Sequence, residues 1–185
     1  VGGMFTRRSA RAVAVDDRHT GEIDMALRTS TLGGDKTADL SAYYVATTNP
    51  IATGRSAAYG LRAQFPNDPW LADFNIRIIE PNYNPAVGFL QRRGFRRMNP
   101  SLSYTTRLNQ HPWIRSIQYG VSGNFQLDTT DNGLLNRDVD ITALNVATHR
   151  QDSFTVKVLP TYERLERNFT ISPGITLPVG TDYTW

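Results

Sequence analysis

The chain has 185 residues, of which 39% are hydrophobic, with 20 basic and 17 acidic side chains, a net charge of +3 and no cysteine. This composition fits one domain, excludes disulfides and cysteine-ligated metals, and gives no indication of nucleic-acid binding, because acids and bases are interleaved. No apolar run approaches the roughly 18 to 20 residues of a spanning helix, which excludes helical membrane proteins but not membrane β-barrels.

Apolar and polar residues alternate along most of the chain, and this alternation predicts β-strands. Side chains on a strand point alternately to opposite faces, so such a segment has one apolar and one polar face. The pattern is clearest at 70–79, where the apolar positions are Trp70, Ala72, Phe74, Ile76 and Ile78. In chain order the predicted strands are 1–7, 10–16, 22–31, 37–47, 55–65, 70–80, 98–107, 113–127, 136–148 and 153–165.

Two of the predicted strands are irregular. The alternation changes phase within 136–148, which predicts a β-bulge near Thr142. Pro160 interrupts 153–165, and proline cannot donate a hydrogen bond to a sheet ladder. We therefore expect both segments to depart from regular pairing at these points.

The predicted connections alternate between short and long without exception. The short ones are Ser9, 32–36, 66–69, 109–112 and 150–152, and the long ones are 17–21, 48–54, 81–97, 128–135 and 166–181. In an up-and-down meander every second connection lies at the same end, so the lengths are sorted by end. Outer-membrane barrels have this asymmetry, with tight periplasmic turns and longer external loops.

Strand length and aromatic placement indicate the same architecture. Most predicted strands are near the 9 to 11 residues of a tilted membrane strand, and aromatic residues cluster near strand ends, as at a membrane interface. The prediction is an all-β, antiparallel up-and-down meander, part of a transmembrane β-barrel with about ten strands visible. We expect 1–185 to be a single β-barrel domain that is truncated at both ends, since both termini read as parts of strands.

The polar faces of these strands hold the first candidate site residues, because they would line the interior of a barrel. They include Asp73, Arg77, Asp138 and Asp140. An unpaired surplus of charge there would set the selectivity of a channel. For each single residue, the favoured interpretation is a cross-strand charge ladder that satisfies itself.

The segment 81–97 holds the other candidates. Its apolar side chains are unusual for a solvent-exposed loop, and Arg92, Arg93, Arg96 and Arg97 form a basic cluster. One interpretation is that the loop folds into or over a barrel mouth, where the arginines meet lumen carboxylates or the phosphate and sugar groups of surface glycolipid. The other is a loop that packs on itself.

No catalytic residue, metal site or cofactor site is predicted. The three histidines lie far apart, in or beside turns, without metal-ligand spacing. Asp138 and Asp140 share a strand face, and paired carboxylates can serve glycoside hydrolysis, but this spacing is common by chance.

A family resemblance is carried by Asn84–Leu90, Gly94–Arg97 and Pro100–Tyr104, together with the opening Val1–Thr6 and, near the end, Ile171–Gly174 and Pro178–Tyr183. Over most of its length the chain resembles a bacterial outer-membrane domain of unknown function (domain of unknown function 5916). The resemblance implies a β-barrel that continues on both sides of this chain. In that family the domain follows a family-nine-type carbohydrate-binding module, and its carbohydrate-binding or hydrolase labels come from that module, so no sugar-binding residue can be assigned here.

Two functional hypotheses follow. The first is an outer-membrane β-barrel segment of a surface or transport protein from a Gram-negative bacterium. It would contact outer-membrane lipid, have no catalysis or cofactor of its own, and be linked to glycan binding or uptake through the preceding module. The alternative is a soluble periplasmic β-sheet protein that binds or hydrolyses carbohydrate.

Overall fold

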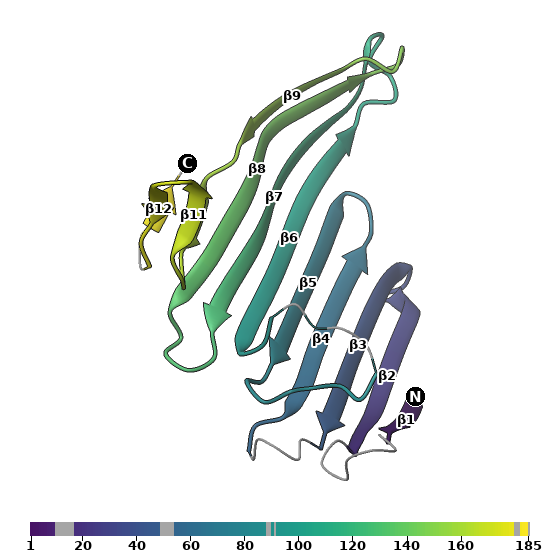
Figure 1. The fold of residues 1–185 in the computed structure, drawn as a ribbon. Coiled ribbons are helices and arrows are strands. Elements are labelled where there is room, and N and C mark those ends of the chain that lie inside the picture. The colour runs from purple at the N-terminus through teal and green to yellow at the C-terminus, as the bar shows by residue number, and fades with distance from the viewer. Residues whose placement is uncertain (10–16, 49–53, 88–89, 91, 180–181, 185) are drawn as a thin grey trace.

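The computed structural model is dominated by one large antiparallel sheet, whose strands follow chain order (Figure 1). The structure describes residues 1–9, 17–48, 54–87, 90, 92–179 and 182–184. The strands are β1 (Gly2–Arg8), β2 (Arg18–Leu32), β3 (Lys36–Thr47), β4 (Ala57–Pro66), β5 (Trp70–Ile79), β6 (Phe95–Arg107), β7 (Ile114–Asp128), β8 (Leu134–Thr148), β9 (Ser153–Val158), β10 (Thr161–Arg164), β11 (Phe169–Ser172), β12 (Ile175–Leu177) and β13 (Asp182–Thr184).

The sheet is open rather than closed. Its order is β1-β2-β3-β4-β5-β6-β7-β8-β10-β13, with β9 also on β8, while β11 and β12 form a separate hairpin. The predicted all-β antiparallel meander is therefore confirmed. In the described part of the chain, no helix is long and apolar enough to cross a membrane.

The N-terminal strands differ from the prediction. The predicted strand at 10–16 lies outside the described residues, but β1 pairs directly with β2, from Gly2 opposite Asp24 to Arg8 opposite Arg18. No strand lies between them, so this part of the predicted order is wrong. The predicted loop at 17–21 is also too long, since β2 begins at Arg18.

The two irregular segments behave as predicted. The register of β8 shifts between Thr142 and Leu144, which is the expected bulge. Ile141 and Leu144 face Val158 and Val156, two positions of one β9 face, so the bulge restores the apolar face. Leu159 and Pro160 separate β9 from β10, and both of these short strands pair with β8.

The connections are sorted between the two ends of the sheet (Figure 1). The turn end holds 33–35, 67–69, 108–113 and 149–152, and the loop end holds 9–17, 48–56, 80–94, 129–133 and 165–181. The predicted strict alternation fails at one point, because 129–133 is no longer than 108–113. The segment 165–181, predicted as a loop, contains the β11–β12 hairpin.

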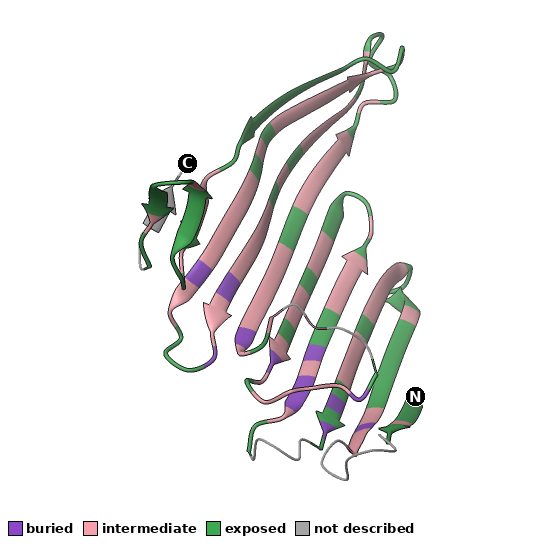
Figure 2. Cartoon of the chain, viewed as in Figure 1, coloured by how far each residue is buried: buried purple, intermediate pink, exposed green. Residues whose placement is uncertain are grey.

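Burial is concentrated at the loop end (Figure 2). The buried hydrophobic residues of the strands, all near that end, are Val45, Ala57, Ala58, Ile79, Phe95 and Leu135. No large side chain is fully buried in the described residues. A single sheet leaves its strands without a second layer, so the small core lies where a loop covers the sheet.

Candidate functional site

The two faces of the sheet are chemically distinct. We call the face that carries Phe74, Ile76 and Ile78 the apolar face, and the face that carries Asp73 and Arg77 the polar face. Cross-strand register places Leu61 and Met98 beside Ile76, and Arg97 beside Arg77, so the two faces continue onto the neighbouring strands. The strand alternation that was read from the sequence therefore becomes a sheet-wide separation of chemistry.

The apolar face is exposed and has no protein layer over it. Within the described residues, the strands of the large sheet contact only their paired neighbours to any extent. The large exposed side chains of this face include Ile23, Met25, Leu27, Leu40, Leu61, Phe74, Leu102, Tyr119, Val121, Ile141, Phe154, Val156 and Val158. Contiguous apolar surface of this extent is rare on soluble monomers and marks a contact with a partner or a membrane.

A hollow of about 700 Å³ lies on the apolar face in the middle of the sheet. Its apolar side chains span β2 to β8, from Leu27 and Leu40 through Phe74 to Leu102 and Val139. Bulky and small residues are mixed there, which leaves depressions between the larger side chains. A surface of this chemistry suits hydrocarbon better than a hydroxyl-rich ligand.

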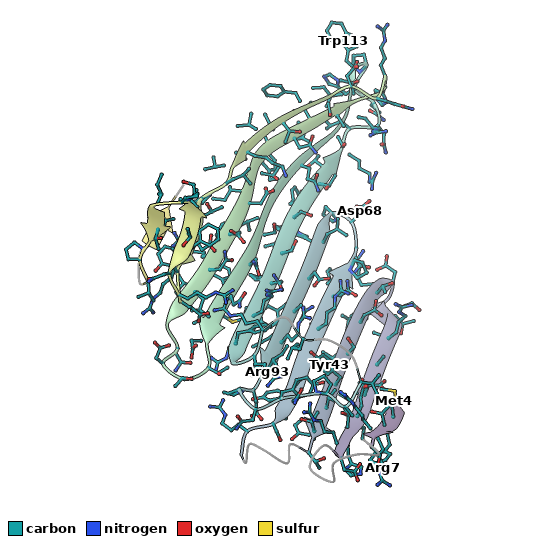
Figure 3. All side chains as sticks on the ribbon, viewed as in Figure 1. Met4, Arg7, Tyr43, Asp68, Arg93 and Trp113 are labelled. Carbon is teal, nitrogen blue, oxygen red and sulfur yellow. The ribbon has the colours of Figure 1, made fainter. Side chains whose placement is uncertain are left out.

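Aromatic rings lie on the apolar face and at the turn end. The Trp70 and Tyr104 rings are 4.7 Å apart by centroid, on adjacent strands near the turn end, and the Tyr44 and Tyr59 rings are 6.1 Å apart. Trp113 is 77% exposed at the far tip of the turn end (Figure 3). Amphipathic rings favour a membrane–water interface.

Cross-strand pairs satisfy much of the polar face, as the charge-ladder interpretation predicted. Arg62 Nη2 donates to Asp73 Oδ2 at 2.6 Å, and the Gln64 amide donates to the same oxygen at 2.6 Å. Lys157 Nζ donates to Asp140 Oδ2 at 2.8 Å. Similar links on this face are Arg28 to Asp39, Asn99 to Asn124, Asn124 to Asp138 and Asn145 to Gln118.

An aromatic ring also covers a glycine on the polar face. Tyr43 and Gly60 are opposite in register, and a Cβ added to Gly60 would lie 2.8 Å from the Tyr43 ring and 2.7 Å from the Ile76 carbonyl oxygen. Only glycine fits there, and the ring covers backbone that glycine leaves bare. Figure 3 labels Tyr43 in the lower, loop-end half of the sheet.

At the loop end, the described part of loop 80–94 runs over the sheet (Figure 1), and its contacts with Thr20 and Thr47 place it on the polar face. It leaves β5 and reaches back to β2, where the Ala86 N–H donates to Thr20 Oγ1 at 2.9 Å. On the way, the Asn84 N–H donates to Thr47 Oγ1 at 3.3 Å. Ala86 is only 3% exposed. The loop is therefore held against the sheet by buried hydrogen bonds.

A small apolar cluster supports this loop. Tyr83 and Leu90 pack on buried Ala58, Ile79 and Phe95. Burial, with smaller contributions from Glu22 and Tyr43, raises the pKa of the Tyr83 hydroxyl above its ordinary value. Of the two interpretations of the segment, docking on the sheet agrees with these contacts better than a loop that packs only on itself.

The predicted arginine cluster is divided among three environments. Arg96 and Arg97 belong to β6 rather than to the loop, and Arg96 lies on the apolar face, opposite Ile78. Arg92 forms an ion pair with Glu166, and Arg93 Nη2 donates to Asn84 Oδ1 at 3.2 Å. The four arginines therefore do not form one patch.

Arg97 is directly opposite Arg77 across β5 and β6, on the polar face. Its Nη2 donates to Gln126 Oε1 at 3.0 Å, and its guanidinium lies 5.3 Å from the Phe95 ring centroid. Gln126 was not singled out from the sequence. The polar alternation of its strand placed it on this face, but only the register shows that it meets Arg97.

No catalytic arrangement is found among the residues described. They contain no group of three metal-ligating side chains. His111 Nδ1 accepts the Trp113 and Ile114 N–H groups, and His149 bonds the His111 carbonyl, so both stabilise a turn. Asp138 and Asp140 do share the polar face as predicted, but their carboxylates are bonded to Asn124 and Lys157.

Comparison with known proteins gives no assignment. No protein-family model, curated protein or solved structure matches the chain significantly. The function therefore has to be inferred from the chemistry of the two faces.

Proposed function

We propose that this sheet is part of an outer-membrane β-barrel, with the apolar face against lipid and the polar face toward the lumen. The protein would act in transport or surface attachment and would not itself catalyse a reaction. The supporting observation is the uncovered apolar face, which extends over the described strands from β1 to β9. A face of this kind needs hydrocarbon around it, because at about 25 cal/mol per Å² its exposure to water would be costly.

Two further features support this proposal. Apart from 129–133, the longer connections gather at one end of the sheet and the shorter ones at the other, as in outer-membrane barrels. Several charges on the polar face are paired between strands, as in a polar barrel interior. Loop 80–94 lies over that face, where some barrels carry a loop as a plug. An open sheet would need further strands at β1 and β13 to close.

The resemblance to the bacterial outer-membrane domain of unknown function is consistent with this proposal and stays a prediction. The same holds for the link to glycan binding or uptake, which would depend on the preceding carbohydrate-binding module. The soluble carbohydrate-active alternative has no specific observation in its favour. The polar hollow that includes Asp140 has a volume of only about 220 Å³, and Asp140 is paired with Lys157 there.

Vesicle flotation of the full chain tests the proposal. Ile76 lies on the apolar face, and a lipid-facing arginine near the midplane costs about 2–4 kcal/mol, so Ile76→Arg should block assembly. Asn75→Arg, the matched control on the polar face, should float with the vesicles as the wild type does. Soluble, detergent-free folding of the wild type and of Ile76→Arg would contradict the proposal.

A further inference from the structure

On the polar face, two arginines lie directly opposite each other across neighbouring strands. Arg77 and Arg97 are a directly opposed pair across β5 and β6. Like charges in that position destabilise a sheet. No carboxylate in the described part of the chain forms an ion pair with either guanidinium, whereas Arg62 on the same face has Asp73.

A neutral side chain holds Arg97 in place. Gln126 is 5% exposed, and its Oε1 accepts the hydrogen bond from Arg97 Nη2. Arg97 is thereby oriented, and keeps its full positive charge. The Phe95 ring beside the guanidinium adds a cation–π contact, which also leaves the charge in place.

The same residues have unused hydrogen-bonding capacity. Arg97 Nε and Gln126 Nε2 are buried and have no partner in the described structure. Buried polar groups normally find one, so each exception calls for an explanation, such as a bound ion. Both atoms are donors, so the missing partner is an acceptor.

The place where Arg77 and Arg97 meet is accessible from one side and covered from another. Arg77 is exposed, whereas Arg97 is partly buried. Loop 80–94 crosses the sheet at this end and carries two further arginines, of which Arg93 is labelled in Figure 3. Several other charges on this face are paired between strands, as in Arg28 with Asp39 and Lys157 with Asp140.

We propose that Arg77 and Arg97, positioned by Gln126, bind an oxyanion on the polar face beside loop 80–94. A guanidinium presents paired donors that match phosphate, sulfate or carboxylate oxygens, and two opposed guanidinium groups become mutually compatible when an anion lies between them. The site does not require the apolar face to meet lipid. In a barrel lumen it would favour anionic solutes.

Calorimetric titration of the full chain in detergent tests this site, with inorganic phosphate in one arm and acetate in the other. We expect saturable binding of at least one probe. Arg77→Gln and Arg97→Gln should each weaken it about tenfold or more, the factor expected when one hydrogen bond to a charged group is lost. Arg150→Gln, which removes the same charge from an exposed turn, should leave it unchanged.

The outcomes separate the ligand classes and the two proposals. Binding of phosphate alone identifies a phosphoryl or sulfate-like ligand, and binding of acetate alone identifies a carboxylate. If Arg97→Gln fails to fold, the exposed Arg77→Gln variant still tests whether the anion binds at this site. No saturable binding of either probe, or equal weakening in Arg150→Gln, overturns the site. Failure of the wild type to float with vesicles would remove the lipid proposal but leave these titrations unaffected.

Discussion

The loop end and the turn end of the same sheet are stabilised in different ways. The loop end has a small protein core, in which loop 80–94 covers Ala58, Ile79 and Phe95. Toward the turn end the strands are joined by short connections, their apolar side chains are exposed, and cross-strand pairs such as Arg62 with Asp73 occupy the polar face. The loop end thus has a small protein core of its own on the polar face, which, among the described residues, the turn end lacks.

Truncating the same residue type in the two environments gives the largest contrast. Phe95 is buried in the loop-end cluster, and Phe95→Ala should lower the free energy of unfolding by about 3–5 kcal/mol. Phe74→Ala, on the exposed apolar face, should cost clearly less in detergent, because detergent fills the space that is left. Urea unfolding of both variants in detergent measures the difference, and equal costs would remove the distinction between the ends.

A smaller effect is expected when the loop loses its anchor on β2. Thr20→Val keeps the side-chain shape but removes the acceptor of the Ala86 N–H, and an unsatisfied buried donor costs about 1–3 kcal/mol. Hydrogen exchange at loop 80–94 should also accelerate. Thr105→Val serves as the control on the same face toward the turn end. If it accelerated hydrogen exchange at loop 80–94 as much as Thr20→Val does, the loop would not be held by this bond.

At the turn end, aromatic pairing should contribute less to the free energy of unfolding than the loop anchor does at the loop end. Trp70→Leu removes the ring contact with Tyr104, and such pairs contribute about 0.5–1.5 kcal/mol beyond their buried area. The matched variant Trp113→Leu alters an exposed ring at the tip and should change unfolding less. If Trp113→Leu lowered the free energy of unfolding more than Trp70→Leu does, Trp113 would have a contact that the sheet itself does not provide.

The smallest effect concerns acid sensitivity at the turn end. A hydrogen bond from Arg107, at 2.6 Å, holds the pKa of Asp68 below its ordinary value, with the Arg107 charge adding to it. A lowered pKa stabilises the fold above the ordinary pKa, and this stability is lost as pH falls from about 4 through the lowered value. The unfolding midpoint should therefore fall slightly less on acidification in Asp68→Asn than in the wild type.

Alternation was enough to predict much of the fold. The strand at 70–80 is nearly the observed β5, and the phase change near Thr142 correctly located a bulge. Period-two patterns report which face a side chain occupies, and this information is local. At the N-terminal edge the predicted strand order was wrong, since β1 pairs directly with β2, whereas the strand predicted at 10–16 lies outside the described residues.

The candidate site could be predicted only in part. Asp73, Arg77, Asp138 and Asp140 were placed on the polar face from alternation, and the register agrees. The arginine segment was misjudged because β6 starts at Phe95, which sends Arg96 and Arg97 to opposite faces. Pairing of Arg77 with Arg97 and contact with Gln126 depend on strand register, which a single sequence does not specify.

Accessibility along β5 tests most directly whether the apolar face meets lipid. The chain has no native cysteine, so single cysteines from position 73 to position 78 can each carry a spin label. In lipid vesicles, collision with oxygen should peak at Phe74, Ile76 and Ile78, and collision with a water-soluble nickel complex at the alternate positions. Equal access of the nickel complex to both sets would contradict a lipid-facing sheet.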